Sequence, residues 1–237
     1  MDDHTLAATL AREAGELLVS IRELGGRVGD QRSNRLLIDR LAQLRPADAV
    51  LSEESPDDPV RTQHSRVWIV DPLDGTREFG EPGRSDWAVH VALAVDGAPV
   101  AGAVALPAAD LVLHTGRPPV LAPPPAPGTV RVALSRSRPS FEVRQLVARL
   151  SATEVPMGSA GAKAMAVVRG EADIYAHSGG QYEWDSCAPV AVALAAGLHV
   201  SRLDGSPLRY NRPDPYLPDL IICRPELAEI ALKALSE

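Results

Sequence analysis

Apolar positions in the first forty-odd residues follow the repeat of an α-helix. The earlier set recurs every three or four residues and predicts an amphipathic helix that ends at Gly25–Gly26. Its members are Leu6, Leu10, Ala14, Leu17, Leu18, Ile21 and Leu24. A second set, Leu36, Leu37, Leu41 and Leu44, predicts another helix that is stopped by Pro46. Gly29 and Asp30, between the two sets, read as loop residues.

Short apolar runs replace the helical repeat after this point and are typical of strands. Residues 49–52 predict a short strand, and the uniformly apolar residues 67–70 predict one that is central in a sheet. Three further runs are separated by turn signals at Asp96–Gly97 and Pro107–Asp110, which predicts an antiparallel meander. These runs are residues 88–95, 100–106 and 111–114.

A proline-rich segment, residues 122–128, is the one clear compositional break and predicts a stiff link between a half 1–121 and a half 129–237. After it, strand-like and helix-like runs alternate, which predicts a βαβ-like half and, for the whole chain, layered sheets and helices. The predicted strands are residues 129–134, 172–175, 198–203 and 220–223. The predicted helices are residues 141–150, 162–168, 186–196 and 225–235.

Composition narrows the class of protein. The 237 residues are 45% apolar, which suffices for a substantial core of a soluble globular protein. The net charge of −7 speaks against nucleic-acid binding, and no apolar run is long enough to cross a membrane. No basic start with an apolar core precedes Asp30, and Cys187 and Cys223 read as buried free thiols, so we expect a cytoplasmic protein. An acidic protein of this kind would need cations to handle a phosphate ester.

The motif D-P-L-D-G-T, residues 71–76, is the strongest chemical signal. Asp71 and Asp74 stand three apart across a Pro/Gly turn at the end of a buried strand, so both point into one crevice. Carboxylate oxygens suit hard divalent cations such as Mg²⁺. Gly75 allows close approach of a ligand, and amides at the start of the following turn suit phosphate. The alternative is a turn in which both carboxylates only satisfy nearby amides.

Four weaker signals each have an ordinary structural explanation as well. Glu53 and Glu54 follow a strand end, where paired glutamates are common on solvated surfaces. Asp185 stands where it can cap the helix 186–196. Residues 158–163, ending in Lys163, can cradle an anion at a helix start, although a solvated lysine explains them too. Asp30 by itself is a loop residue.

Together and in order, these signals resemble the inositol monophosphatase superfamily, whose pattern is a lone upstream Asp, a Glu-Glu pair, D-P-[IL]-D-G-T and a distal W-D. Other segments resemble its CysQ-type 3′(2′),5′-bisphosphate nucleotidases. They are V-L-S-E-E (50–54), W-I-V-D-P-L-D-G-T-R-E-F (68–79), G-S-A-G-A-K-A-M (158–165), E-W-D-S-C-A-P (183–189) and L-D-G-S-P-L-R-Y-N (203–211). The resemblance covers residues 28–223. Residues 27–30 depart from the family's V-T-x-A-D, but the following Q-R-S-N-R-L-L still places Asp30 at the family position.

The resemblance implies a fold and an activity. The fold is an αβαβα layered sandwich of the α+β / α/β type, like inositol monophosphatase and fructose-1,6-bisphosphatase. The activity is a Mg²⁺-dependent hydrolysis that removes the 3′-phosphate of 3′-phosphoadenosine 5′-phosphate, and also of 3′-phosphoadenylyl sulfate, by activated water. Inositol phosphate or fructose 1,6-bisphosphate on the same scaffold is an alternative. A non-catalytic metal- or phosphate-binding regulator is another, although every expected ligand is intact.

Roles for individual residues come from the same resemblance, which implies two or more Mg²⁺ per active site. Glu53, Asp71 and the carbonyl of Leu73 would hold one ion, and Asp71, Asp74 and Asp185 a second. Thr76 and Asp30 would orient the attacking water, with help from Glu54. The amides of Gly75 and Thr76 would bind the transferred phosphoryl group. Substrate contacts would come from Asp185, Ser159, Lys163 and Arg77. The partner is a small phosphate ester, with neither nucleic acid nor membrane, and relatives are often homodimers.

Overall fold

Two five-stranded mixed sheets form the frame of the protein in the computed structural model, which describes residues 1–121, 123–124 and 128–236. The first has the order β1-β2-β3-β4-β5, with β1 parallel to β2 and the other pairs antiparallel. Its strands are β1 (Ala49–Ser52), β2 (Arg66–Asp74), β3 (Ala88–Val95), β4 (Ala98–Leu106) and β5 (Leu111–His114). The meander predicted from the turn signals is therefore confirmed.

The second sheet has the order β7-β6-β8-β10-β9. Its strands are β6 (Arg131–Ser135), β7 (Thr153–Met157), β8 (Ile174–Tyr182), β9 (His199–Ser201) and β10 (Tyr216–Cys223). Strand β6 runs parallel to both β7 and β8, whereas β10 is antiparallel to β8 and β9.

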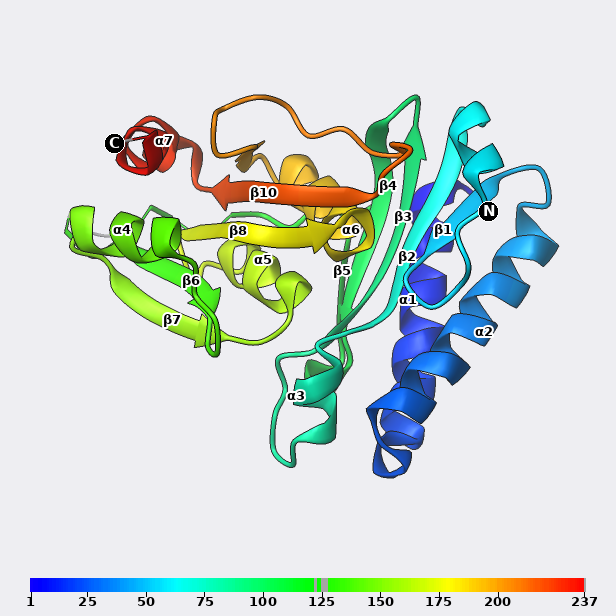
Figure 1. Cartoon of the computed structure of the whole chain (residues 1–237). Coiled ribbons are helices and arrows are strands. Elements are labelled where there is room, and N and C mark those ends of the chain that lie inside the picture. Colours follow the sequence, from blue (N-terminus) through cyan, green and yellow to red (C-terminus); the bar gives the residue numbers. More distant parts are fainter. Residues whose placement is uncertain (122, 125–127, 237) are drawn as a thin grey trace.

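Helices fill three layers around these sheets (Figure 1). Helices α1 (Asp3–Ser20) and α2 (Gly26–Leu44) cover the outer face of the first sheet. Helices α5 (Ala160–Val168) and α6 (Glu183–Ala195) lie between the sheets and contact strands of both. Helices α4 (Phe141–Arg149) and α7 (Ala228–Ser236) lie on the far side of the second sheet, and the short α3 (Thr76–Gly80) follows β2. This is the predicted αβαβα sandwich.

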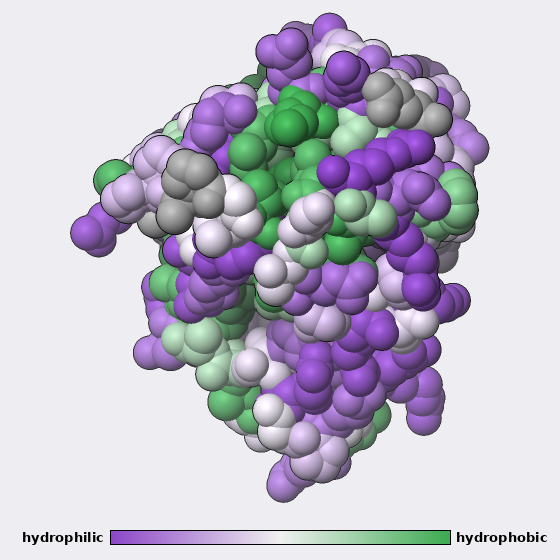
Figure 2. Space-filling view, turned by 90° about the vertical axis from the view of Figure 1, so that its left-hand side faces the viewer, coloured by the Kyte–Doolittle hydropathy of each residue, from purple (hydrophilic) through white to green (hydrophobic). Residues whose placement is uncertain are grey.

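The core belongs to both sheets rather than to one half of the chain. Its largest cluster takes side chains from β1–β4, from α5 and α6, and from β8 and β10. Cys187 and Cys223 are buried free thiols, as expected. No helix within the described residues is both long and apolar enough to cross a membrane. The face at the α4/α7 end is largely hydrophilic, with an apolar area in its upper half (Figure 2).

The structure corrects the boundaries of several predicted elements. Helix α2 begins at Gly26, so Gly29 and Asp30 are helical rather than loop residues. The apolar repeat is absent there because that side of the helix packs closely against the D-P-L-D-G-T turn. A Cβ on Gly26 would lie 2.6 Å from Thr76 Cγ2, and one on Gly29 would lie 3.1 Å from the Phe79 ring. Small and polar residues therefore replace leucines at this end of α2.

Two further elements in the second half differ from the prediction. Strand β7 was not predicted, because it is a largely exposed edge strand that contains Pro156, and an edge strand tolerates proline. Helix α6 begins three residues earlier than predicted, with Tyr182 rather than Asp185 as its N-cap. In the predicted proline-rich link, residues 122 and 125–127 lie outside the described residues.

Candidate active site

The end of β2 places two carboxylates in the interior. Residues 67–70 are fully buried, and the pairing of β2 with β3 shifts register between Asp71 and Asp74. This irregularity lets both side chains face the same space, although they are three residues apart. The amide of Leu73 donates to Asp71 Oδ1 at 3.0 Å, and Gly75 follows at a φ of +86°. A Cβ on Gly75 would lie 3.1 Å from Ser159 Cβ, so only glycine fits this turn without strain.

Helix α6 brings a third carboxylate to the same place. Oxygens of Asp71, Asp74 and Asp185 all lie within 4.8 Å of one another, and we call these three residues the carboxylate cluster. Asp185 sits in the first turn of α6, where its Oδ2 accepts a hydrogen bond from the amide of Tyr182 at 2.7 Å. Its second oxygen remains for a ligand. Residues 71 and 185 are thus brought together only by the fold.

Asp74 is held by the start of helix α5. Its carboxylate accepts hydrogen bonds from the hydroxyl of Ser159, from the amide of Gly161 at 2.6 Å and from the amide of Ala160 at 3.2 Å. The sequence suggested that residues 158–163 cradle an anion, and the anion they bind in the structure is the protein's own Asp74. Burial opposes the charge, but His90, Ser159 and Gly161 together lower the pKa of Asp74 to about 2.

His90 is a contact that the sequence interpretation missed. It is fully buried in β3, with Nε2 3.2 Å from Asp74 Oδ2 and Nδ1 3.0 Å from the carbonyl of Trp184. Burial disfavours the imidazolium, yet the hydrogen bond and charge of Asp74 raise the pKa of His90. A signal was present, because His90 is the one polar residue in an otherwise apolar strand, and such a residue needs a buried partner.

Unlike Asp74, the carboxyls in and around the carboxylate cluster have pKa values that favour the protonated form. Burial, followed by the charges of Glu54 and Glu53, raises the pKa of Asp30 to about 8. Desolvation and the charges of Asp185 and Asp74 raise the pKa of Glu53 to about 7, although its side chain is exposed at the surface. Asp185 has its pKa raised to about 6 by burial and by Asp74, and burial together with Glu53 raises the pKa of Asp71 well above its usual range.

These properties fit a site for divalent cations. The ligand atoms are oxygens, which Mg²⁺ and similar hard ions prefer. Oδ1 of Asp30 is buried without a hydrogen-bond partner among the described residues. Several carboxylates packed together stay ionised only if positive charge compensates them. The residues of this site therefore fit bound divalent cations, because without them the closely packed carboxylates lack compensating positive charge.

The remaining predicted residues lie around the same centre. Thr76 donates its hydroxyl to the carbonyl of Leu73 at 3.1 Å, and a hydrogen bond with Thr76 stabilises ionised Asp30. Glu54 is exposed and acts on both Asp30 and Glu53 through its charge. Ser159 is the N-cap of α5, with its hydroxyl shared between Asp74 and the amide of Ala162.

Lys163 is not the solvated helix lysine of the alternative interpretation. It is 5% exposed, its ammonium donates to the carbonyls of Gly158 and Ser159, and it lies 5.4 Å from the centroid of the Tyr175 ring. An ammonium has three N–H donors. Two of these donors bind the carbonyls of Gly158 and Ser159, just before α5. The third N–H is therefore the one that Lys163 can donate to a ligand.

A pocket of about 300 Å³ opens beside the carboxylate cluster and is lined by all six predicted substrate-binding residues. Asp74, Gly75, Thr76, Arg77, Ser159, Lys163 and Asp185 all line it. Among the lining residues that the sequence interpretation missed are Glu78, Ser137, Arg138, His177 and Gln181. Arg138 is an exposed cation from the loop after β6, so the pocket has positive charge at a distance from its acidic end. No sequence motif marked this loop.

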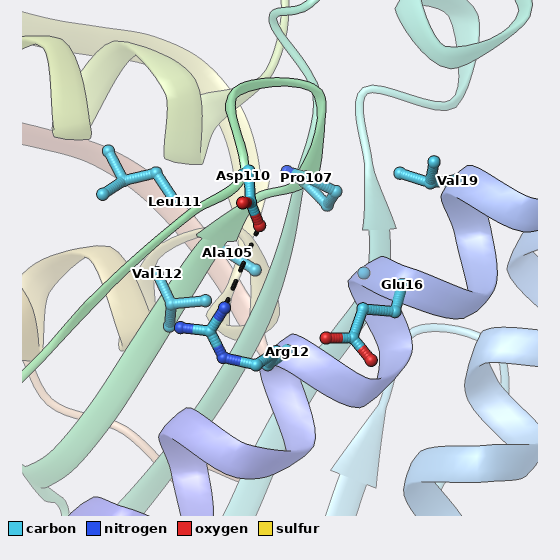
Figure 3. A pocket seen from close by; sticks show the side chains of 9 residues that line it. Arg12, Glu16, Val19, Ala105, Pro107, Asp110, Leu111 and Val112 are labelled. Atoms are coloured by element: carbon cyan, nitrogen blue, oxygen red, sulfur yellow. Dashed lines mark ion pairs between the residues drawn. The ribbon is translucent and has the colours of Figure 1, made fainter.

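A second pocket, of about 280 Å³, lies between α1 and the β4–β5 hairpin (Figure 3). Val19, Pro107, Leu111 and Val112 line much of it, and the exposed pair Arg12–Asp110 lies 4.0 Å apart. It contains neither a member of the carboxylate cluster nor a buried titratable group. The pocket beside the carboxylate cluster is therefore the better candidate for the active site.

Gly161 should not tolerate a side chain, because a Cβ there would lie 2.0 Å from Nε2 of His90. We expect Gly161→Ala to lower the free energy of unfolding by about 1–3 kcal/mol, the usual cost of overpacking a core. Urea denaturation measures this. Gly80→Ala is the matched control, since a Cβ there meets nothing within 4 Å, and it should leave stability unchanged or raised. Equal effects of both variants would contradict the packing shown here.

Comparison with known proteins gives consistent results. Residues 27–237 match the sequence profile of the inositol monophosphatase family. A Mycobacterium bovis protein named 3′-phosphoadenosine 5′-phosphate phosphatase is 52% identical over 95% of this chain and 90% of its own length. The 3′(2′),5′-bisphosphate nucleotidase CysQ of Escherichia coli is 31% identical over 79% of this chain and 80% of its own. The solved structure of CysQ from Bacteroides thetaiotaomicron is 26% identical, with a TM-score of 0.79 over 92% of this chain and 96% of that one.

Proposed function

Because the chain belongs to the inositol monophosphatase family, we propose that it hydrolyses the 3′-phosphate of 3′-phosphoadenosine 5′-phosphate, and of 3′-phosphoadenylyl sulfate, with the help of Mg²⁺. The observation that carries this proposal is the convergence of Asp71, Asp74 and Asp185 at the edge of a pocket with cationic residues. The named relatives support the nucleotide substrate over an inositol or sugar phosphate.

Four acidic residues and one carbonyl would hold the cations. We assign Glu53, Asp71 and the carbonyl of Leu73 to one Mg²⁺, and Asp71, Asp74 and Asp185 to a second. Bound cations of this kind neutralise a phosphate ester and favour the ionised form of a nearby water. The carbonyl of Leu73 accepts the hydroxyl of Thr76 in this structure, and its second lone pair would remain for the cation.

The protein's own residues would position the reactants. Asp30, hydrogen-bonded to Thr76, would help to orient the attacking water. Thr76 would orient that water, and Glu54 would assist through its charge. The amides of Gly75 and Thr76 would bind the transferred phosphoryl group, and the water would attack it directly, without a covalent intermediate.

Polar and cationic residues of the pocket would recognise the second phosphate of the substrate. Arg77, Ser159 and Lys163 are the contacts expected from the resemblance, and all three line the pocket. We add Arg138, because its exposed guanidinium is well suited to bind a phosphate through two hydrogen bonds. A monophosphate substrate lacks the group that this end would bind.

The test is phosphate release from three substrates measured side by side, with and without Mg²⁺. We expect kcat/KM for 3′-phosphoadenosine 5′-phosphate to exceed that for inositol 1-phosphate and for fructose 1,6-bisphosphate by at least about tenfold, corresponding to 1.4 kcal/mol of discrimination. We also expect all activity to require the cation. A tenfold preference for inositol 1-phosphate would overturn the choice of substrate.

A pair of variants localises the selectivity within the pocket. Arg138→Ala should raise KM for the bisphosphate and reduce its preference over inositol 1-phosphate. Arg144→Ala, also exposed but on α4 and outside the pocket, is the matched control and should leave both substrates unaffected. If Arg144→Ala matched Arg138→Ala, the effect would come from general surface charge and not from a phosphate site.

The family resemblance also suggests a domain division, a cellular location and an assembly. We propose a division into halves 1–121 and 129–237 that together form the active site, a cytoplasmic location, and a homodimeric assembly. The shared core supports halves that fold together rather than separately, because the largest apolar cluster takes residues from both.

A further inference from the structure

Helix α2 touches both loops that carry the proposed cation ligands. Gly26 packs against Thr76 of the D-P-L-D-G-T turn, and two turns further on Ser33 contacts this turn while Asn34 contacts the loop after β1. From this arrangement we infer that Ser33 and Asn34 are positioning residues that set the distance between Glu53 and Asp71–Asp74. The inference rests on the proposed function, since it assigns these residues to the cation site.

Ser33 fixes the turn that carries Asp71 and Asp74. It is fully buried, and its hydroxyl donates to the carbonyl of Pro72 at 2.8 Å. Proline has no N–H, so the carbonyl is the only backbone group of residue 72 by which a neighbour can hold the turn. Ser33 therefore anchors the residue that lies between two proposed ligands, Asp71 and the carbonyl of Leu73.

Asn34 fixes the loop that carries Glu53 and Glu54. Its Oδ1 accepts from the hydroxyl of Ser52 at 2.7 Å, and its Nδ2 lies 3.1 Å from Oγ of Ser55 and 3.5 Å from the carbonyl of Glu54. One amide side chain thus holds the loop on both sides of the glutamate pair. The hydroxyl of Ser52 also accepts from the amide of Glu54 at 3.4 Å, which tightens the same turn.

The two loops would separate without these anchors, because they carry like charges. Ser52 and Val70 are paired in the parallel strands β1 and β2, so Glu53 and Asp71 follow side by side with like charges. Ser33 and Asn34 are consecutive residues of a 19-residue helix whose other end is anchored by buried Leu37 and Leu41. A helix is rigid over this length, so the two anchor points stay a fixed distance apart. The ligands are thereby held in place before any cation binds.

Mg²⁺ binding to the full-length protein, measured by calorimetry without substrate, tests this inference. We expect Asn34→Ala to weaken binding by about tenfold or more, the scale of losing an outer partner of a metal ligand. The Mg²⁺ concentration for half-maximal activity should rise in proportion, whereas kcat at saturating Mg²⁺ should change little. Ser33→Ala should act in the same direction. If Ser33→Ala does not fold, Asn34→Ala decides the question.

Gln31→Ala is the matched control, because Gln31 is an exposed amide side chain on the same helix. It should bind Mg²⁺ like the wild type. Wild-type affinity in Asn34→Ala, or an equal loss in Gln31→Ala, would overturn the inference. A wild-type protein that releases no phosphate from any substrate would instead contradict the proposed function, and the calorimetric comparison would still stand on its own.

Discussion

Replacing Asp71 with Asn is expected to abolish phosphate release while raising the melting temperature of the cation-free protein. Asp71 is buried among Glu53, Asp74, Asp185 and Asp30, and this environment raises its pKa well above the usual range. Its charge is therefore unfavourable for folding but required for binding a cation. We expect activity to fall by at least roughly 100-fold, because even outer partners of metal ligands cost up to that factor. Phosphate release and thermal melting in a chelator measure the two effects.

Asp74→Asn separates this explanation from a general effect of neutralising a carboxylate. Asp74 accepts hydrogen bonds from Ser159, Ala160 and Gly161, and an amide NH₂ in its place would face these donors. We expect Asp74→Asn also to lose activity, but to lower the free energy of unfolding by about 1–3 kcal/mol, the cost of leaving buried groups unpaired. A rise in stability for both variants, or a fall for both, would contradict the environments described for these two carboxylates.

The second large effect should be a pH-dependent stabilisation by Mg²⁺. The pKa values of Asp30, Glu53 and Asp185 are raised to about 8, 7 and 6. The folded protein thus binds protons there that the unfolded chain has already released. The stability that these protons contribute is complete below the unfolded pKa values near 4 and is lost as the pH rises through 6 to 8. A cation replaces the lost protons, so its effect should grow over the same range.

Melting curves with and without Mg²⁺ at pH 6 and pH 8 measure this effect. A cation at a hundred times its dissociation constant contributes about 2.7 kcal/mol, or roughly 5–10 °C in a chain of this size. We expect a shift of that order at pH 8 and a clearly smaller one at pH 6, where protons compete for the carboxylates. At each pH the melting temperature with Mg²⁺ is compared with the one without it. Histidines distant from the site, such as His114 and His177, titrate equally in both samples, so their contribution to stability cancels; burial lowers the pKa of both.

Asp110→Asn is the matched control for this experiment. Asp110 is fully exposed, its ion pair with Arg12 spans 4.0 Å, and its positive φ is one that asparagine adopts readily. The variant should keep the wild-type dependence on pH and Mg²⁺. A Mg²⁺-induced shift that is equal at pH 6 and pH 8 in the wild-type protein would show that the carboxylate cluster is not where the cation binds.

Local sequence patterns predicted much of this protein. The D-P-L-D-G-T motif lies within ten residues of the buried segment that positions it, so the direction of Asp71 and Asp74 follows from strand, proline and glycine geometry. Likewise, the meander from β2 to β5 follows from alternating apolar runs and turn residues. The class of fold and the expected site came from the family resemblance, which short motifs in a fixed order carry.

The tertiary structure alone decided how distant residues share the site. Ser159 binds Asp74 across 85 positions, and Ser33 binds Pro72 across 39. Nothing in either local segment identifies its partner, because such hydrogen bonds depend on how helices and sheets pack. The helical start of α2 was hidden for the same reason, since its small and polar residues satisfy a neighbouring turn rather than an apolar core. The residue types in each local segment thus determined which side chains can bind a cation or a phosphate. The packing of helices and sheets determined which of these side chains lie together.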